Sequence, residues 1–142
     1  MQCRFWNILV ILGLLVGCEA HEEEVPAAAT PPTFSEISGL LIERGCAESN
    51  CHQGAEPKAG LNLEAGFSFD ALVNQPCSMP GAVELGLNLV TPGEPDDSFL
   101  YVKITLEEDD SLLGRPMPIT GKGLSVEDTE LIRRWIEAGA LP

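Results

Sequence analysis

The chain has few basic residues: 8 Lys and Arg stand against 22 Asp and Glu among 142 residues, which gives a formal net charge of −14 at pH 7. Proteins that bind nucleic acid or anionic lipid surfaces use clustered positive side chains to neutralise phosphate groups. The shortage therefore argues against both as direct partners. Any electrostatic protein partner is expected to be basic, although an acidic surface is explained equally well by its contribution to solubility.

Recognisable catalytic patterns are also absent. The sequence contains no Ser/His/Asp-type triad, no glycine-rich phosphate loop and no paired His/Glu metal motif. Residues 33–142 contain no internal repeat and no apolar run long enough to cross a bilayer. We therefore do not expect an enzyme, and an enzymatic hypothesis would depend entirely on a reactive cofactor.

The beginning of the chain is typical of an export signal. Arg4 precedes an apolar run from Phe5 to Val16, which is too short to span a bilayer but suits the central region of a secretory signal. Leu15-Val16-Gly17-Cys18 resembles a bacterial lipoprotein processing box, in which the chain is cut before the cysteine and lipid is attached to its sulfur. The resemblance implies a signal peptide at 1–17 and a lipid anchor at Cys18, on the extracytoplasmic side of a bacterial membrane. An ordinary signal peptide with an incidental cysteine is the alternative.

Residues 18–32 have the composition of a linker. A charged stretch from His21 to Glu24 is followed by a segment rich in proline and alanine. Such a composition offers no apolar surface to bury, so we expect an extended spacer. The remaining segment, 33–142, is long enough for one domain with a small core.

The first half of that domain carries separate helix and loop signals. Thr33 to Glu36 has the pattern of a capping box, so a helix is expected to begin there and to end at Gly45. We predict a short helix over 67–74. Residues 75–81 contain two prolines and a glycine, and they are predicted to form a loop.

The second half contains one ambiguous segment. The apolar residues of 99–106 fit either a strand or one face of a helix, and the Asp96-Asp97-Ser98 sequence before them favours a helix start. Residues 107–110 and 112–123 are predicted to be loops. The last helix is the clearest element, capped by Ser125 and ended by Gly139, with a buried stripe of Leu131, Ile132, Trp135 and Ile136. We expect Trp135 to pack against the first helix.

Two cysteines and a histidine, Cys46, Cys51 and His52, form the motif most suggestive of chemistry. Two thiols can add to the vinyl groups of haem, and a histidine directly after the second thiol can then ligate the iron. The usual spacing is CxxCH, whereas this chain has CxxxxCH. A local Cys46–Cys51 disulfide and a zinc site that recruits Cys77 are alternatives, as is chance.

Several short motifs occur in an order that resembles a class I cytochrome c domain, and more closely the cytochrome-like domains of certain bacterial surface lipoproteins and planctomycete-type proteins. The resemblance covers most of 33–142. Its motifs are Cys46 to His52, Ala59 to Leu63, Val90 to Pro95 with Ser98 and Leu100, Pro116-Met117-Pro118, and Leu131 to Ala140.

This resemblance implies an all-α domain that holds one covalent haem c and carries single electrons. Cys46 and Cys51 would be the thioether anchors, His52 the proximal iron ligand and Met117 the distal one. Met79 is the alternative distal ligand. Two other functions stay open: a haem-free lipoprotein domain with a Cys46–Cys51 disulfide, and a haem sensor or enzyme with an open sixth iron position.

Overall fold

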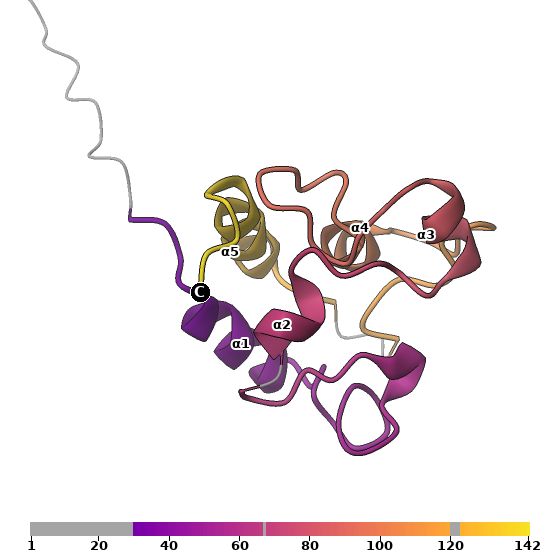
Figure 1. Cartoon of the computed structure of the whole chain (residues 1–142), viewed down its shortest axis with the longest axis horizontal. Helices are drawn as coiled ribbons and strands as arrows, with labels where there is room; N and C mark the ends of the chain where they lie inside the picture. The colour runs from indigo at the N-terminus through magenta and orange to yellow at the C-terminus, as the bar shows by residue number, and fades with distance from the viewer. Residues whose placement is uncertain (1–29, 67, 120–122) are drawn as a thin grey trace, which may run out of the picture.

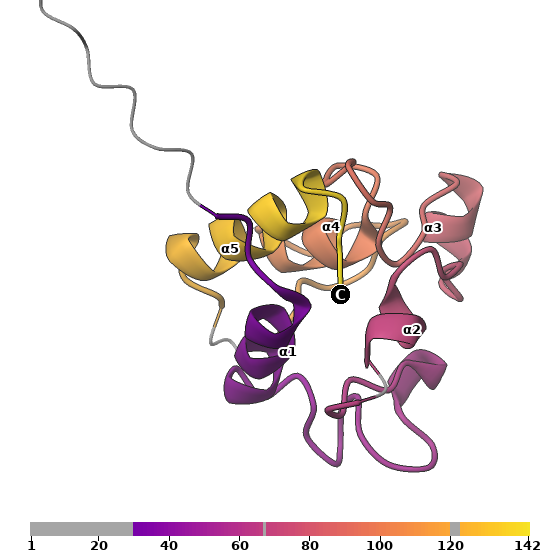
Figure 2. The same cartoon turned by 60° about the vertical axis from the view of Figure 1, so that its left-hand side comes forward.

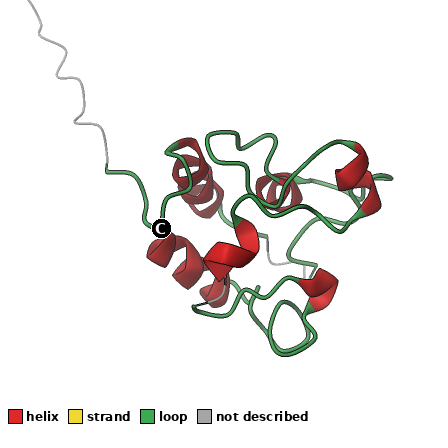
Figure 3. Ribbon diagram, viewed as in Figure 1, coloured by secondary structure: helices red, strands yellow, loops and turns green. Residues whose placement is uncertain are grey.

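The computed structural model describes residues 30–66, 68–119 and 123–142. The predicted signal peptide at 1–17, the lipidation site at Cys18 and nearly all of the linker lie outside these residues. Within them the chain forms helices and isolated β-bridges but no strand, so the all-α prediction is confirmed (Figure 3). The elements are α1 (Phe34–Glu43), the 3₁₀ turn η1 (Lys58–Gly60), α2 (Ser68–Leu72), α3 (Pro80–Glu84), α4 (Phe99–Thr105) and α5 (Val126–Glu137) (Figure 1).

Helix α1 begins at the predicted capping box. The Thr33 hydroxyl accepts a hydrogen bond from the Glu36 amide at 3.4 Å, and the Glu36 carboxylate accepts one from the Thr33 amide at 2.7 Å. The two bonds satisfy amides that a helix start otherwise leaves without a partner. Gly45 follows the helix with a φ of 77°, a left-handed conformation that glycine adopts at little cost. The chain therefore turns sharply just before Cys46.

Helix α5 also begins as the sequence predicts. Ser125 and Asp128 form a second capping box, and Gly139 has a φ of 99° just beyond the helix end. Ile132, Trp135 and Ile136 are fully buried, whereas Leu131 is only partly buried. The Trp135 ring lies 5.6 Å from the Phe34 ring of α1, centroid to centroid, which confirms the predicted contact between the two helices.

The main core lies where the two end helices meet the middle of the chain. Helix α5 packs against both α1 and α4, and in Figure 2 α4 and α5 lie above α1 while α2 lies to its right. None of the helices in the described ranges is long and apolar enough to cross a membrane. The buried members of the core come from six segments: Ile37, Leu40, Leu41, Leu63, Leu72, Val90, Ile132, Trp135, Ile136 and Ala140.

The middle of the chain confirms some predictions and corrects one. Segment 99–105 is helical as α4, so the strand alternative is wrong, and α2 covers 68–72, which is shorter than the helix predicted at 67–74. The loop prediction for 75–81 is wrong at its end, because α3 starts at Pro80. Proline has the φ of a helix and lacks the amide that the first turn cannot use, so it suits this position.

Ser98 precedes α4 but does not cap it. Its buried hydroxyl accepts a hydrogen bond from the Thr91 amide at 2.9 Å and donates to the Glu94 carbonyl at 2.8 Å. The side chain therefore closes the loop of residues 91–98 on itself. This loop is fixed to the last helix by the Gly93 amide, which donates to the Ile136 carbonyl at 2.8 Å.

Candidate functional site

One large cavity of about 1050 Å³ lies between α1, α2, α4 and the loops that join them. It brings together Cys46, Cys51 and His52 with the two methionines Met79 and Met117, which come from loops far apart in the sequence. All four of the predicted cofactor-binding residues therefore border one space. The walls are largely apolar, with Leu41, Leu61, Leu63, Leu72, Leu89, Phe99, Leu100 and Ile104 among the lining residues.

The wide spacing between the two cavity cysteines is accommodated by an exposed loop. Cys46 follows α1 directly, and its amide donates to the Leu41 carbonyl at 2.9 Å. The His52 amide donates back to the Cys46 carbonyl at 3.1 Å, which closes the loop. The residues at 48–50 between them are exposed. The two additional residues of CxxxxCH therefore leave both thiol-bearing ends of the loop against the same cavity.

The imidazole of His52 is oriented by a backbone carbonyl. Its Nδ1 lies 3.2 Å from the Leu61 oxygen, and because a carbonyl can only accept, a hydrogen bond here requires the proton to be on Nδ1. In the neutral ring, Nε2 is then the nitrogen with a free lone pair. The Leu63 amide donates to the His52 carbonyl at 2.8 Å and holds the two segments side by side. Such a bond to the second ring nitrogen is the usual way in which proteins fix a metal-ligating histidine.

A carboxylate fastens the loop that follows His52. Glu64 accepts hydrogen bonds from the Asn62 side chain at 3.0 Å, the Gly54 amide at 3.2 Å and the Gln53 side chain at 3.3 Å. These bonds, that from Asn62 foremost, lower the pKa of Glu64. Glu64 thus joins the loop after His52 to the segment that contains Leu61, whose carbonyl orients the imidazole.

The three described cysteines have different surroundings. Cys46, Cys51 and Cys77 are all free thiols, the first two half-buried at the cavity. Burial, and then the neighbouring Cys51, raises the pKa of the Cys46 thiol. Cys77 lies instead in a separate small cluster with Ala82 and Phe99, where burial raises its pKa to about 11. Within the described ranges, no group of three or more His, Cys, Asp or Glu side chains could hold a metal ion.

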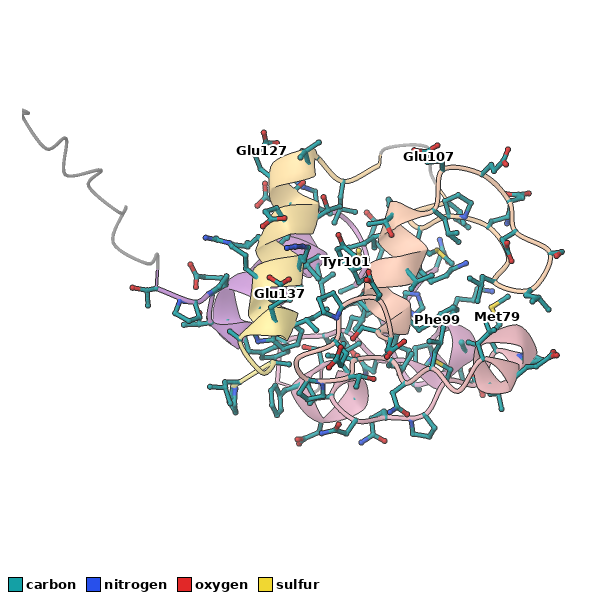
Figure 4. The ribbon with its side chains drawn as sticks, turned by 90° about the horizontal axis from the view of Figure 1, so that it is seen from above. Met79, Phe99, Tyr101, Glu107, Glu127 and Glu137 are labelled. Carbon is teal, nitrogen blue, oxygen red and sulfur yellow. The ribbon has the colours of Figure 1, made fainter. Side chains whose placement is uncertain are left out.

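The two methionines border the cavity with different freedom. Met79 packs against the small cluster of Cys77 and Phe99, and Met79 and Phe99 lie near each other in Figure 4. The terminal methyl carbon of Met79 lies 2.8 Å from where a Cβ on Gly114 would be. Met117 belongs to neither core cluster and is 36% exposed. The side chain of Met79 is therefore held by packing contacts in a core cluster, whereas that of Met117 is not.

Lys103 is a site residue that the sequence patterns did not reveal. It is only 8% exposed, and its Nζ donates to the carbonyls of Leu113, at 2.8 Å, and Arg115. Burial lowers its pKa. The available signal was a single lysine in the otherwise apolar stretch of α4, but its carbonyl partners could not be read from that pattern.

Positive charge is concentrated around the cavity despite the acidity of the chain. The lining includes Arg44, Lys58, Lys103 and Arg115, and among the described residues only the two arginines of α5 lie elsewhere. Arg44 is held by Asp128, with its Nε 2.7 Å from one carboxylate oxygen and its Nη2 3.0 Å from the other. An apolar space with cations along its lining suits a ligand that is largely apolar but carries acidic groups.

Comparisons with known proteins give no independent assignment: no family model, no curated protein and no solved structure matches the chain.

Proposed function

We propose that this protein is a monohaem c-type cytochrome that transfers single electrons outside the cytoplasm. The observation that supports this best is the meeting of Cys46, Cys51, His52 and Met117 at one apolar cavity of about 1050 Å³. In the sequence, the CxxxxCH motif and the Pro-Met-Pro motif are separate and individually weak signals. Their convergence on the same space is what two axial ligands of one iron require.

The lining residues fit a haem in chemistry as well as in size. A porphyrin is a flat, mostly apolar ring with two carboxylate side chains, and the cavity combines leucine-rich walls with four cationic residues. Its volume lies at the upper end of the range of about 300–1,000 Å³ that is usual for ligand pockets. Arg115 and Lys58 are exposed, which leaves their charged ends available to carboxylates at the opening.

Each thiol would attach the ring by addition to one vinyl group. In that addition the sulfur of Cys46 or Cys51 would bond to one vinyl carbon and the thiol hydrogen would go to the neighbouring carbon, so that the double bond would become single. This addition needs no external oxidant or reductant. His52 would bind the iron through Nε2, since Nδ1 is engaged with the Leu61 carbonyl.

The distal ligand is assigned to Met117 on the basis of its packing. A methionine sulfur binds iron weakly, so it must be free to reach the metal and yet be carried by a fixed loop. Met117 meets both conditions, because its side chain belongs to neither core cluster while its amide donates to the Lys103 carbonyl at 2.8 Å. Met79 is already packed at Gly114.

Covalently bound haem supplies an iron that gains and loses one electron reversibly. Two protein ligands leave no position for a substrate, so His52 and Met117 favour electron transfer over catalysis. Electrons would come from one redox protein and pass to another, and the acidic surface favours partners with basic docking faces.

The test is production of the mature protein in a host that has haem-attachment machinery. Wild-type protein should keep its colour after denaturation and acid-acetone extraction, with a pyridine haemochrome spectrum typical of thioether-linked haem. The double variant Cys46→Ala/Cys51→Ala should lose the covalent link. Cys77→Ala is the matched control, because Cys77 lies in a separate cluster and should leave haem attachment intact. Colourless wild-type protein containing a Cys46–Cys51 disulfide would contradict the proposal and favour the haem-free lipoprotein.

We also propose that the domain is held to a bacterial membrane by lipid on Cys18, with residues 18–32 as a spacer. The support is the Leu15 to Cys18 sequence. Cys18→Ser should abolish lipid attachment and leave the signal peptide uncleaved. Mass spectrometry and membrane fractionation measure both effects, and an unchanged mass in the membrane fraction would contradict the assignment.

A further inference from the structure

We propose that Lys103 is the positioning residue that holds the Met117 loop against the cavity and thereby keeps the methionine on the iron. This inference rests on the proposed function, because it names a residue that serves the distal ligand. It starts from the buried side chain of Lys103, a lysine with 8% exposure in the last turn of α4.

Burying an ammonium group is unfavourable unless its charge is compensated. Among the described residues Lys103 forms no ion pair, and its Nζ is satisfied by the backbone carbonyls of Leu113 and Arg115 instead. It also lies 5.7 Å from the centroid of the Phe99 ring, a weak cation–π contact. Lys103 therefore anchors the backbone at Leu113 and Arg115 and does not act as part of a surface ion pair.

Both bonds run to one segment, the loop that leads to Met117. A third bond joins the same two residues, because the Met117 amide donates to the Lys103 carbonyl at 2.8 Å. One residue of α4 thus contacts the loop at positions 113, 115 and 117. The loop is held from the side of the cavity, since Lys103, Arg115 and Met117 all line it.

The loop has little else to hold it near the methionine. Residues 110–114 are closed on themselves by reciprocal bonds between the backbones of Asp110 and Gly114 and by the Asp110 carboxylate. Beyond them, the hydrogen bonds that the described part of 115–119 makes all run to Lys103. Pro116 and Pro118 have no amide to donate, so the Met117 amide is the donor between them.

A weak sulfur-to-iron bond is sensitive to such an anchor. Without the two Nζ bonds, the segment would keep one backbone hydrogen bond to another described residue, that of the Met117 amide, and the sulfur would leave the iron more often. Hydrogen bonds from a charged donor are strong enough that losing two should raise the fraction of iron without a methionine ligand by about tenfold or more. Haem attachment, which depends on Cys46 and Cys51, should be unaffected.

The experiment compares three variants of the mature haem protein: Lys103→Met, Lys103→Arg and Arg133→Met. Methionine keeps the length and apolar stem of lysine but cannot donate, and arginine keeps donors and charge. Arg133→Met is the control, because it also replaces a cationic side chain by methionine but lies on α5, outside the cavity lining, where Arg133 forms exposed ion pairs. The readouts are the weak sulfur-to-iron absorption of the oxidised protein, carbon monoxide binding by the reduced protein and the reduction potential.

Lys103→Met should lose most of the sulfur-to-iron absorption, bind carbon monoxide readily and show a lower potential, with the covalent haem retained. Lys103→Arg should recover part of the absorption, and Arg133→Met should resemble the wild type. Should Lys103→Met fail to fold, Lys103→Gln, which keeps a shorter amide donor, should give an intermediate result.

An unchanged absorption and potential in folded Lys103→Met, or in folded Lys103→Gln, would overturn the assignment of Lys103 while leaving the cytochrome proposal intact. Wild-type protein without covalent haem would overturn both. Wild-type haem protein that lacks the sulfur-to-iron absorption would overturn the Met117 assignment and, with it, the role of Lys103.

Discussion

The contact between Arg44 and Asp128 makes a sharp prediction about stability. Arg44 ends α1 just before Gly45 and Cys46, and Asp128 lies in the first turn of α5. Two hydrogen bonds, of 2.7 and 3.0 Å, join the guanidinium to both carboxylate oxygens. The pair therefore ties the beginning of the cysteine loop to the last helix, and Asp128→Ala removes it.

The expected loss of stability follows from the exposure of the two side chains and from the number of hydrogen bonds that Asp128 forms. The Asp128 side chain is 11% exposed and that of Arg44 38%, so the pair lies between an exposed pair, at about 0–1 kcal/mol, and a buried charged hydrogen bond, at about 1.5–3 kcal/mol. Asp128 also accepts the Ser125 amide at 3.0 Å, which adds roughly 0.5–1 kcal/mol of capping. We expect Asp128→Ala to lower the free energy of unfolding by about 2–3 kcal/mol, or the Tm by about 10 °C.

Thermal unfolding followed by far-UV circular dichroism measures the effect. The control is Glu137→Ala on the same helix, which breaks a 2.9 Å pair with Arg133 whose side chains are 43% and 36% exposed. That change should cost no more than about 0.5 kcal/mol. Equal Tm values for Asp128→Ala and Glu137→Ala would refute the reasoning.

The pH dependence gives a second check. The hydrogen bond from Arg44, foremost among several causes, lowers the pKa of Asp128. A carboxyl with a lowered pKa in the folded state adds stability above its unfolded pKa of about 3.9 and loses it as the pH falls through the folded value. Asp128→Asn cannot titrate. Its deficit relative to the wild type should therefore be full at neutral pH and shrink below about pH 4; a deficit that stays constant down to strongly acidic pH would contradict the ion-pair explanation.

Three further predictions concern packing. Gly81→Ala should destabilise the protein by about 1–3 kcal/mol in chemical denaturation, because the new methyl would collide with the Leu112 carbonyl, and a neutral result would show that α3 can shift away. Trp135→Ala should cost about 3–5 kcal/mol or prevent folding, since the ring is fully buried and its Nε1 donates to the Leu141 carbonyl at 2.9 Å; a small change in Tm would contradict this. Native Cys77 should react with a thiol reagent far more slowly at pH 7 than after unfolding, because burial raises its pKa to about 11 and covers its sulfur, and equal rates would be inconsistent with that burial.

The elements that the sequence predicts well are those with local signals at their ends. The capping boxes at Thr33 and Ser125 and the glycines after α1 and α5 act within a few residues, so they can be read without the fold. The sequence did not predict helix α3, because a proline such as Pro80 is common both in loops and at the first position of a helix. The fold decides between them by packing Gly81 and Ala82 into the interior.

The candidate site divides in the same way. Cys46, Cys51 and His52 are adjacent in sequence, so their grouping was predictable. The carbonyl of Leu61 that orients His52, and the anchoring of the Met117 loop by Lys103, are backbone contacts between distant segments. Because every residue has a backbone carbonyl, the residue types do not show which carbonyl accepts a given hydrogen bond. Such partners are known only from the folded structure.

The pairing of α1 with α5 also sets an order of events during synthesis. The ribosome makes the cysteine loop well before Val126–Glu137, the helix whose Trp135 packs on Phe34 and covers the core. Contacts between the two ends of a chain form late, because a long loop must be closed first. Until then the core against which Cys46 packs is incomplete, so the thiol of this residue is more accessible than in the finished fold.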